Sequence, residues 1–258
     1  MRASFSFRRH WNTVMPAFII LVCLLLTWQG AVWLMDMPPW LLPAPTDVIH
    51  RFLATSTLGY HTGITVMEAA TGFLISVVLA ISLAAMIVHS RFLERGLLPY
   101  IVLSNAIPIV AIIPLLTIWF GFGMTPRVMI CTIVTFFPIV TNTTQGLKSA
   151  DKRVLEFMHS INATRLEILL KVQLPSALPS IFAGFKIAAS LSLVGAVVAE
   201  FYSSDRGLGY LIITAATELR TDLLFVAVTV LAALGVISFT FFSWLERKSF
   251  RGEGRADQ

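Results

Sequence analysis

Long apolar stretches alternate with short polar segments along the 258-residue chain. A helix needs about 20 apolar residues to cross the hydrocarbon core of a bilayer. Six stretches reach that length or come close to it, namely residues 14–35, 64–88, 97–120, 128–145, 181–199 and 223–245. The fourth is the weakest, because its last residues are polar. The pattern predicts an all-α, polytopic membrane protein with six transmembrane helices.

The positions of the basic residues predict how these spans are oriented. Cytoplasmic loops of membrane proteins are enriched in lysine and arginine. With the N-terminus inside, six spans put fifteen of the nineteen basic residues in the cytoplasm and leave outside only Arg51, Arg127, Arg206 and Arg220. An odd number of spans would turn the basic C-terminal ERKSFRGEGR outward. We therefore expect both termini in the cytoplasm, which also accounts for the formal charge of +5 without a nucleic-acid partner.

The chain divides into three parts by composition. Residues 1–62 are expected to form an anchor helix and an outer loop, residues 63–247 the transmembrane core, and residues 248–258 a short cytoplasmic tail. The prolines of PPWLLPAP in the outer loop favour extended or turning backbone. The following TDVIHRFLAT predicts a short interfacial helix capped at Thr46 or Asp47.

Two spans have unusual compositions. The third contains Pro99, Pro108 and Pro114, so we expect a kinked helix whose freed carbonyls are covered by protein or line a wet cavity. Proline kinks with no part in transport are the alternative. In the fifth span small residues recur every four positions and form a smooth face that lets another helix approach closely. They are Gly184, Ala188, Ser192 and Ala196. Their spacing leaves open whether the partner helix belongs to this chain or to another subunit.

The insert at residues 147–175 is charged and amphipathic. Apolar residues at helical spacing predict two short helices, around residues 154–161 and 166–170. Asn162 between them tolerates the left-handed conformation of a turn. Thr164 and Glu167 have the spacing of a capping box. We expect the second helix to stop near Leu174, because Pro175 disfavours helix at the preceding residue. A helix pair lying on anionic lipid headgroups is the alternative.

The insert resembles the EAA loop of the permease subunits of bacterial ABC importers. Glu156 occupies the acidic position of that motif, Asn162 the glycine position, and Val172, Leu174 and Pro175 the terminal I-x-L-P positions. The resemblance implies that the first short helix is a coupling helix docking on a separate ATPase subunit. The residues assigned to this coupling loop are Glu156, Phe157, Met158, Ile161, Asn162, Thr164, Glu167, Leu174 and Pro175. Phe157 and Met158 replace the two alanines of the motif, and Asn162 replaces its glycine.

The resemblance extends over residues 63–247. The blocks IPIVAIIPLLTIWFGFG, FFPIVTNTTQGL, QLPSALPSIFAGFK and AEFYSSDRGLGYLI are similar to permeases of the nitrate, sulfonate, taurine and thiamine-precursor importers. The resemblance implies a bacterial inner-membrane subunit. It also implies three kinds of partner: a second permease copy in a homodimer or heterodimer, two ATPase subunits and an extracytoplasmic solute-binding protein. Glu68 stands where such permeases usually have arginine. An acid inside a span is costly unless it is paired or hydrated, so Glu68 is either a functional group or a residue near the outer interface.

Several kinds of chemistry have no motif in this sequence. It contains no G-x-x-x-x-G-K-[ST] loop, so we expect ATP and magnesium to bind to the partner ATPase and no cofactor to bind to this chain. The histidines are scattered, and Cys23 and Cys131 lie in apolar runs, which favours packing roles. We therefore expect a non-catalytic subunit. An ion-driven secondary transporter is the main alternative, and a membrane-embedded enzyme lacks any set of converging reactive groups.

Polar groups expected to face inward are weaker candidates for the translocation pathway. They are Ser104, Asn105, Thr141, Asn142 and Glu200.

Overall fold

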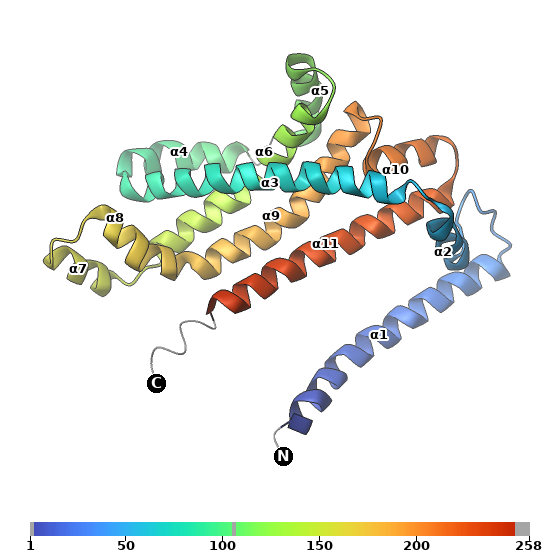
Figure 1. Cartoon of the computed structure of the whole chain (residues 1–258), viewed down its shortest axis with the longest axis horizontal. Coiled ribbons are helices and arrows are strands. Elements are labelled where there is room, and N and C mark those ends of the chain that lie inside the picture. The colour runs from blue at the N-terminus through green and yellow to red at the C-terminus, as the bar shows by residue number, and fades with distance from the viewer. Residues whose placement is uncertain (1–2, 105–106, 251–258) are drawn as a thin grey trace. The chain divides into compact units, whose positions relative to one another are not determined.

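The computed structural model describes residues 3–104 and 107–250, and within them every regular element is helical (Figure 1). The helices are α1 (Ala3–Leu34), α2 (Pro45–Ala54), α3 (Leu58–His89), α4 (Arg91–Ser104), α5 (Ile109–Phe120), α6 (Met124–Lys148), α7 (Lys152–Ser160), α8 (Arg165–Ile168), a π-helical turn η1 (Leu169–Gln173), α9 (Leu174–Ser203), α10 (Leu208–Thr217) and α11 (Thr221–Phe250). The all-α prediction is confirmed.

Four of the described helical segments are long and apolar enough to cross a bilayer, namely 58–89, 124–148, 165–202 and 221–249. They match the second, fourth, fifth and sixth predicted spans. Shorter apolar helices cover residues 18–34, 109–120 and 208–217. The six-span count stays a prediction, because the first and third predicted spans correspond to these shorter pieces.

The third predicted span is two helices instead of one kinked helix. α4 ends at Ser104 and α5 begins at Ile109, with Pro108 in extended backbone as its N-cap. A proline disfavours helical backbone at the residue before it and donates no amide hydrogen. Pro99 and Pro114 lie inside α4 and α5. Pro108 is therefore the proline that coincides with a helix start.

The start of α2 differs from the prediction at Thr46 or Asp47. Ala44 is the N-cap and Pro45 the first helical residue, a position where the missing amide hydrogen costs nothing. Asp47 instead occupies the third helical position, and its Oδ2 accepts a hydrogen bond from the Ala44 amide at 3.1 Å.

The described residues separate into two compact units, the first including residues 3–58 and 211–228 and the second residues 59–104, 107–210 and 229–250. In the first unit, Arg51 and Asp222 form an ion pair at 2.6 Å. The rings of Trp28 and Phe225 lie 5.3 Å apart between centroids. These contacts join the N-terminal helices to the start of α11.

The second unit is built on α6 and α9, which run side by side (Figure 1). Glycines allow their close approach on both helices. A Cβ added at Gly146 of α6 would lie 2.8 Å from the Cβ of Ser180, and one at Gly184 of α9 would lie 3.0 Å from that of Asn142. The small-residue face of α9 therefore packs on α6 of the same chain, which the sequence alone left open.

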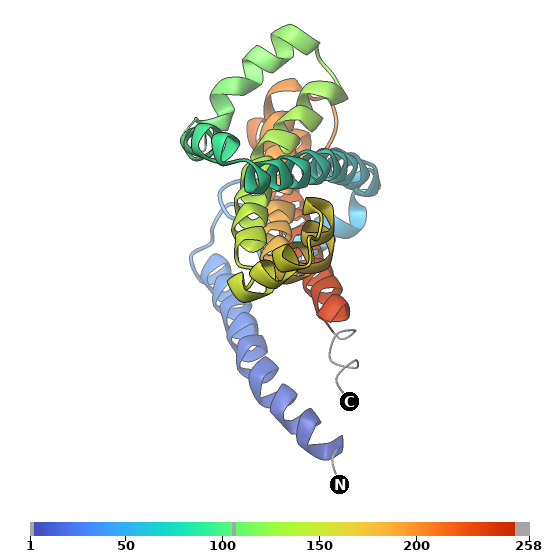
Figure 2. The ribbon, with the colours of Figure 1, turned by 90° about the vertical axis from the view of Figure 1, so that its left-hand side faces the viewer.

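α3 and α11 complete the core of the second unit. Gly72 of α3 faces α6 so closely that an added Cβ would be 2.3 Å from the Cβ of Cys131. Phe73 of α3, Phe185 of α9 and Phe242 of α11 form an aromatic cluster with centroid distances of 5.2–5.8 Å. In Figure 2 the end of this unit that carries α7 and α8 faces the viewer.

Filling the α6–α9 contact should destabilise the protein. We expect Gly184→Leu to reduce stability by about 1–3 kcal/mol through overpacking, seen as a lower melting temperature in detergent. Gly235→Leu on α11 is the matched control, because a Cβ there meets no atom within 4 Å. Equal melting temperatures for the two variants would contradict the close contact at Gly184.

Candidate functional site

The α7–α8 hairpin (residues 152–168) lies between the ends of α6 and α9 (Figure 1). Asp151 caps α7, with its side chain accepting a hydrogen bond from the Arg153 amide at 2.9 Å. No residue of α7 is buried. Its apolar side chains Val154 and Phe157, together with Ile161 just beyond its end, are 41%, 62% and 57% exposed. The chain thus presents an uncovered apolar stripe on this hairpin.

The turn after α7 depends on a left-handed residue, as predicted. Asn162 has φ of +55°. Its amide donates to the His159 carbonyl, and the Ala163 amide donates to the Met158 carbonyl, both at 3.0 Å. This pair of bonds is a Schellman motif, in which the left-handed residue is most often glycine and sometimes asparagine. Asn162 therefore performs the backbone role that the motif's glycine would have.

The predicted capping box is confirmed. The Thr164 hydroxyl accepts from the Glu167 amide at 3.3 Å, and Glu167 Oε2 accepts from the Thr164 amide at 2.9 Å. Together with the Schellman turn, this cap satisfies backbone groups at both sides of the hairpin's bend. The relative direction of α7 and α8 is therefore set by hydrogen bonds within the hairpin.

The expectation that the second helix stops near Leu174 is wrong. The chain passes from α8 through the π turn Leu169–Gln173 into α9, and the Leu174 amide donates to the Leu169 carbonyl. Pro175 has no amide hydrogen, and in an α-helix its ring would clash with the carbonyl four residues earlier. The π turn shifts the bonding register just before the proline. The hairpin is thus continuous with a membrane-length helix.

The coupling-loop candidates differ in exposure. Glu156, Phe157, Ile161, Asn162 and Thr164 are exposed, while the others are half-buried or nearly so. The remaining candidates are Met158, Glu167, Leu174 and Pro175. The exposed candidates all lie on α7 and its turn to α8, which leaves this part of the hairpin accessible to a partner.

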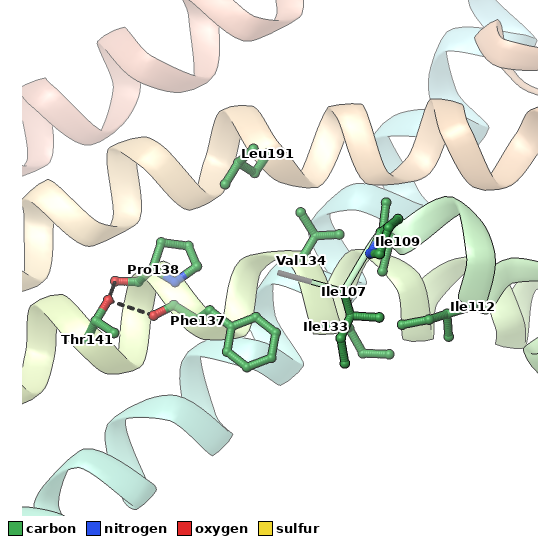
Figure 3. Close-up of a pocket in the computed structure, with 10 residues that line it drawn as sticks. Ile107, Ile109, Ile112, Ile133, Val134, Phe137, Pro138, Thr141 and Leu191 are labelled. Atoms are coloured by element: carbon green, nitrogen blue, oxygen red, sulfur yellow. Dashed lines mark hydrogen bonds between the residues drawn. The ribbon is translucent and has the colours of Figure 1, made fainter. Parts of the chain in front are cut away.

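The predicted pathway residues do not converge on one place. Thr141 lines a cavity of about 520 Å³ between α5, α6 and α9, and its hydroxyl donates to the Phe137 carbonyl at 2.7 Å (Figure 3). Asn142, the next residue of α6, donates to the Pro138 carbonyl at 2.8 Å. Of Ser104 only the backbone at the end of α4 is described, and Asn105 lies outside the described residues.

Glu200 is buried in a polar cluster instead of lining this cavity. Its Oε1 accepts from the Thr65 hydroxyl at 2.7 Å, and its Oε2 accepts from the Gly209 amide at 2.5 Å. Two neighbouring amides find acceptors on α3: Leu208 N donates to Thr65 Oγ1 at 2.8 Å and Gly207 N to His61 Nδ1 at 3.0 Å. Glu200 and α3 therefore cap the start of α10.

Glycine is required beside the Glu200 carboxylate. Gly207 has φ of +104°, and an added Cβ would lie 2.2 Å from Glu200 Oε1. At Gly209 an added Cβ would lie 2.8 Å from Glu200 Oε2. The carboxylate consequently sits directly against the first amides of α10, where the helix dipole favours negative charge.

Glu68 has a partner that sequence reasoning did not assign. It is 1% exposed, and its Oε1 accepts a hydrogen bond from Arg127 Nη1 in a buried ion pair. Arg127 also donates to the Gly123 carbonyl at 2.7 Å and to Ser204 Oγ at 2.9 Å. The sequence indicated only that an acid inside a span needs a cationic partner, and Arg127 was one of the four basic residues expected outside.

Comparison with known proteins identifies the family. Residues 72–251, more than half of the chain, match the family described as the inner membrane component of binding-protein-dependent transport systems. The riboflavin transport system permease protein RibX of Chloroflexus aurantiacus is 37% identical over 91% of this chain and 89% of its own length. The chain therefore belongs to this family and is a non-catalytic permease subunit of an ABC importer. The alternatives of a secondary transporter and a membrane enzyme are set aside.

Other relatives agree with the predicted branch. The formylaminopyrimidine transport permease protein ThiX of Halalkalibacterium halodurans is 30% identical over 93% of this chain and 96% of its own length. The taurine permease TauC of Escherichia coli is 28% identical over 84% of this chain and 82% of its own length. A crystal structure of an amino acid ABC transporter has the same fold, with a TM-score of 0.62 at 16% identity, covering 78% of this chain and 97% of that one. The protein is accordingly a multi-pass inner-membrane subunit.

The Schellman turn yields a test of the hairpin. We expect Asn162→Ile to destabilise the bend by about 1–2 kcal/mol, because a β-branched residue resists the left-handed conformation. Amide hydrogen exchange at residues 158–168 of the detergent-purified chain should accelerate about tenfold. Asn162→Gly is the control and should exchange as slowly as the wild type. Slow exchange in both variants would argue against the hydrogen-bonded bend.

Proposed function

We propose that the α7–α8 hairpin receives the ATPase subunit of the importer and passes its movement to α6 and α9. The observation that carries this proposal is the exposed stripe of Val154, Phe157 and Ile161 on a hairpin whose bend is internally hydrogen-bonded. Apolar and aromatic side chains left uncovered on a rigid element are typical of a protein interface. In this proposal ATP and magnesium bind to the ATPase subunit, and no residue of this chain binds either of them.

The distribution of basic residues supports a cytoplasmic location for the hairpin. Six spans with both termini in the cytoplasm place fifteen of nineteen lysines and arginines on the same side as the hairpin. Residues 1–62 then contribute an anchor helix and an outer loop, residues 63–247 the permease core, and residues 248–258 the cytoplasmic tail. The end of the second unit that carries Glu68 and Glu200 faces outward in this topology.

The assembly we propose contains two permease chains, two ATPase subunits and an extracytoplasmic binding protein. The second permease is another copy of this chain. Nucleotide binding favours one conformation of the assembly over the other, because a ligand with equal affinity for both would shift nothing. The cargo is a small solute of the kind named for the relatives, a pyrimidine, a flavin or a sulfonate such as taurine.

The cavity beside Thr141 is our candidate for part of the translocation pathway, with Asn142, Ser104, Asn105 and Glu200 as weaker candidates. It is lined mainly by apolar side chains from α5, α6 and α9, with the Thr141 hydroxyl among them (Figure 3). α5 begins after Pro108, so one wall of the cavity belongs to a short helix of its own. An apolar wall with few polar groups suits the passage of a small organic solute without trapping it.

The docking proposal predicts a loss of assembly when the stripe becomes charged. Phe157→Asp should reduce co-purification of the ATPase subunit encoded with this chain by at least tenfold, because a buried carboxylate would replace an aromatic contact. Glu156→Lys should also weaken the complex. Phe92→Asp is the control, since Phe92 is an 85% exposed aromatic on α4. Undiminished binding by Phe157→Asp would refute the assignment of the stripe.

The pathway proposal predicts a transport defect that leaves ATP hydrolysis intact. Thr141→Leu should fill part of the cavity and reduce solute uptake in reconstituted liposomes several-fold, while basal ATPase activity stays at the wild-type level. Thr240→Leu on α11 is the matched control, because its hydroxyl also bonds the carbonyl four residues earlier, at 2.7 Å. Normal uptake by Thr141→Leu would remove this cavity from the pathway.

A further inference from the structure

The buried polar cluster holds the turn between α9 and α10 from both sides. At the start of the turn, Ser204 Oγ accepts a hydrogen bond from Arg127 Nη1 at 2.9 Å. At its end, the Gly207 amide donates to His61 Nδ1 at 3.0 Å. Within the turn, Ser204 Oγ also accepts from the Arg206 amide at 3.1 Å. Side chains of α3 and α6 therefore hold the turn between α9 and α10 by hydrogen bonds.

A cavity of about 400 Å³ lies on this turn, and Arg127 forms part of its lining. Its other lining residues are Phe122, Gly123, Tyr202, Ser204, Asp205 and Arg206. The Arg127 side chain is only 5% exposed, because it is engaged by Glu68 and Ser204. The guanidinium thus closes the cavity against the interior of the second unit.

A close helix crossing of this unit lies one helical turn beyond Arg127. Cys131 follows Arg127 by four residues on α6 and is fully buried. It packs against Gly72 of α3, and its Sγ lies 3.5 Å from the Ser192 carbonyl of α9. Any separation of α3, α6 and α9 that starts at Arg127 would expose this thiol next.

We propose that Arg127, with Glu68 and Ser204, forms a latch that closes the extracytoplasmic end of the translocation pathway, and that these are positioning residues for transport. Opening consists of the release of Ser204 and Glu68 by Arg127 and a movement of the α9–α10 turn away from α6. This inference rests on the proposed function and its topology. Glu200 stays with α10, because its carboxylate is held by the Gly209 amide and the Thr65 hydroxyl.

A charged latch suits a gate for an energetic reason. Burying an ion pair costs desolvation that offsets most of its attraction, so the closed pair is only weakly favoured over a hydrated open state. An apolar plug would resist hydration instead. The two charges of the latch belong to different helices, α3 and α6, so their separation coincides with the parting of those helices.

α6 supplies the physical link between the latch and the hairpin. From Arg127 to Lys148 the helix is continuous, which corresponds to about 30 Å at 1.5 Å per residue. Along this length α6 is packed on α9 through Gly146 and Gly184. A displacement at the hairpin is therefore carried by two closely packed helices that both end at the latch.

The thiol of Cys131 reports on the latch directly. In a Cys23→Ser background, the assembled transporter in nanodiscs is treated with a membrane-impermeant maleimide, without nucleotide and after trapping with ATP and vanadate. We expect slow labelling of Cys131 in one of these states and at least tenfold faster labelling in the other, because a buried thiol is inert until exposed. Glu68→Gln should make labelling fast in both states.

Two further variants separate gating from general damage. Ser204→Ala removes one contact of Arg127 and should raise labelling in the slow state even if Glu68→Gln does not fold. Glu94→Gln is the control, because it breaks an exposed ion pair with Lys148, at 2.5 Å, near the hairpin end of the unit. Its Cys131 labelling should match the wild type.

The outcomes distinguish the latch from the proposed function. An ATPase subunit that binds and hydrolyses ATP while Cys131 labels equally in both states would overturn the latch alone. Labelling by Ser204→Ala that equals the wild type would do the same. Failure of the ATPase subunit to bind the wild-type chain would overturn the proposed function, and the latch with it.

Discussion

The close approach of α6 and α9 is the contact on which the rest of the permease core depends. Gly146 on one helix and Gly184 on the other leave no room for a Cβ, so the two backbones meet directly. In a bilayer, lipid tails are as apolar as leucine, and helix association relies on such packing instead of on exclusion of water. α3 joins the pair in the same manner through Gly72, against Cys131. Three helices thereby form one closely packed body.

This packing determines which membrane helices a movement of the hairpin would reach. The α7–α8 hairpin is inserted between the end of α6 and the start of α9, so both of its connections lead into the packed pair. Its bend is held by the Schellman turn at Asn162 and the cap at Thr164. The π turn at residues 169–173 keeps the connection helical past Pro175. A push on the hairpin would therefore reach α9 through continuous helical backbone and α6 through the short link at residues 149–151.

At the opposite end of the same helices, buried charged side chains join the elements by hydrogen bonds and an ion pair. Glu68, Arg127 and Glu200 are all nearly or fully buried, and each accepts or donates a hydrogen bond that reaches another element of the fold. Buried ionisable groups within membrane spans are costly and are found where they have a partner and a task. Glu200 holds the first turn of α10, whereas Arg127 joins α3, α6 and the turn after α9. The core is thus tightly packed along its length and polar at one end.

The sequence by itself determined the class of fold, most span positions and the details of the hairpin's bend. These features depend on local chemistry: apolar length, the left-handed tolerance of Asn162, and the spacing of Thr164 and Glu167. The resemblance to the family motif gave the prediction that the hairpin docks on an ATPase subunit. Local rules failed at Pro175 and at the start of α2, where the π turn and the bond from Ala44 to Asp47 changed the expected boundaries.

Tertiary structure alone decided which helix meets the small face of α9 and which cation neutralises Glu68. It also decided that Glu200 caps α10 instead of lining the cavity beside Thr141. The physical reason is that these outcomes depend on contacts between residues far apart in the chain, 59 positions for Glu68 with Arg127 and 135 for Thr65 with Glu200. Helical periodicity specifies the face on which a residue lies, and only the packing of the helices specifies what that face meets.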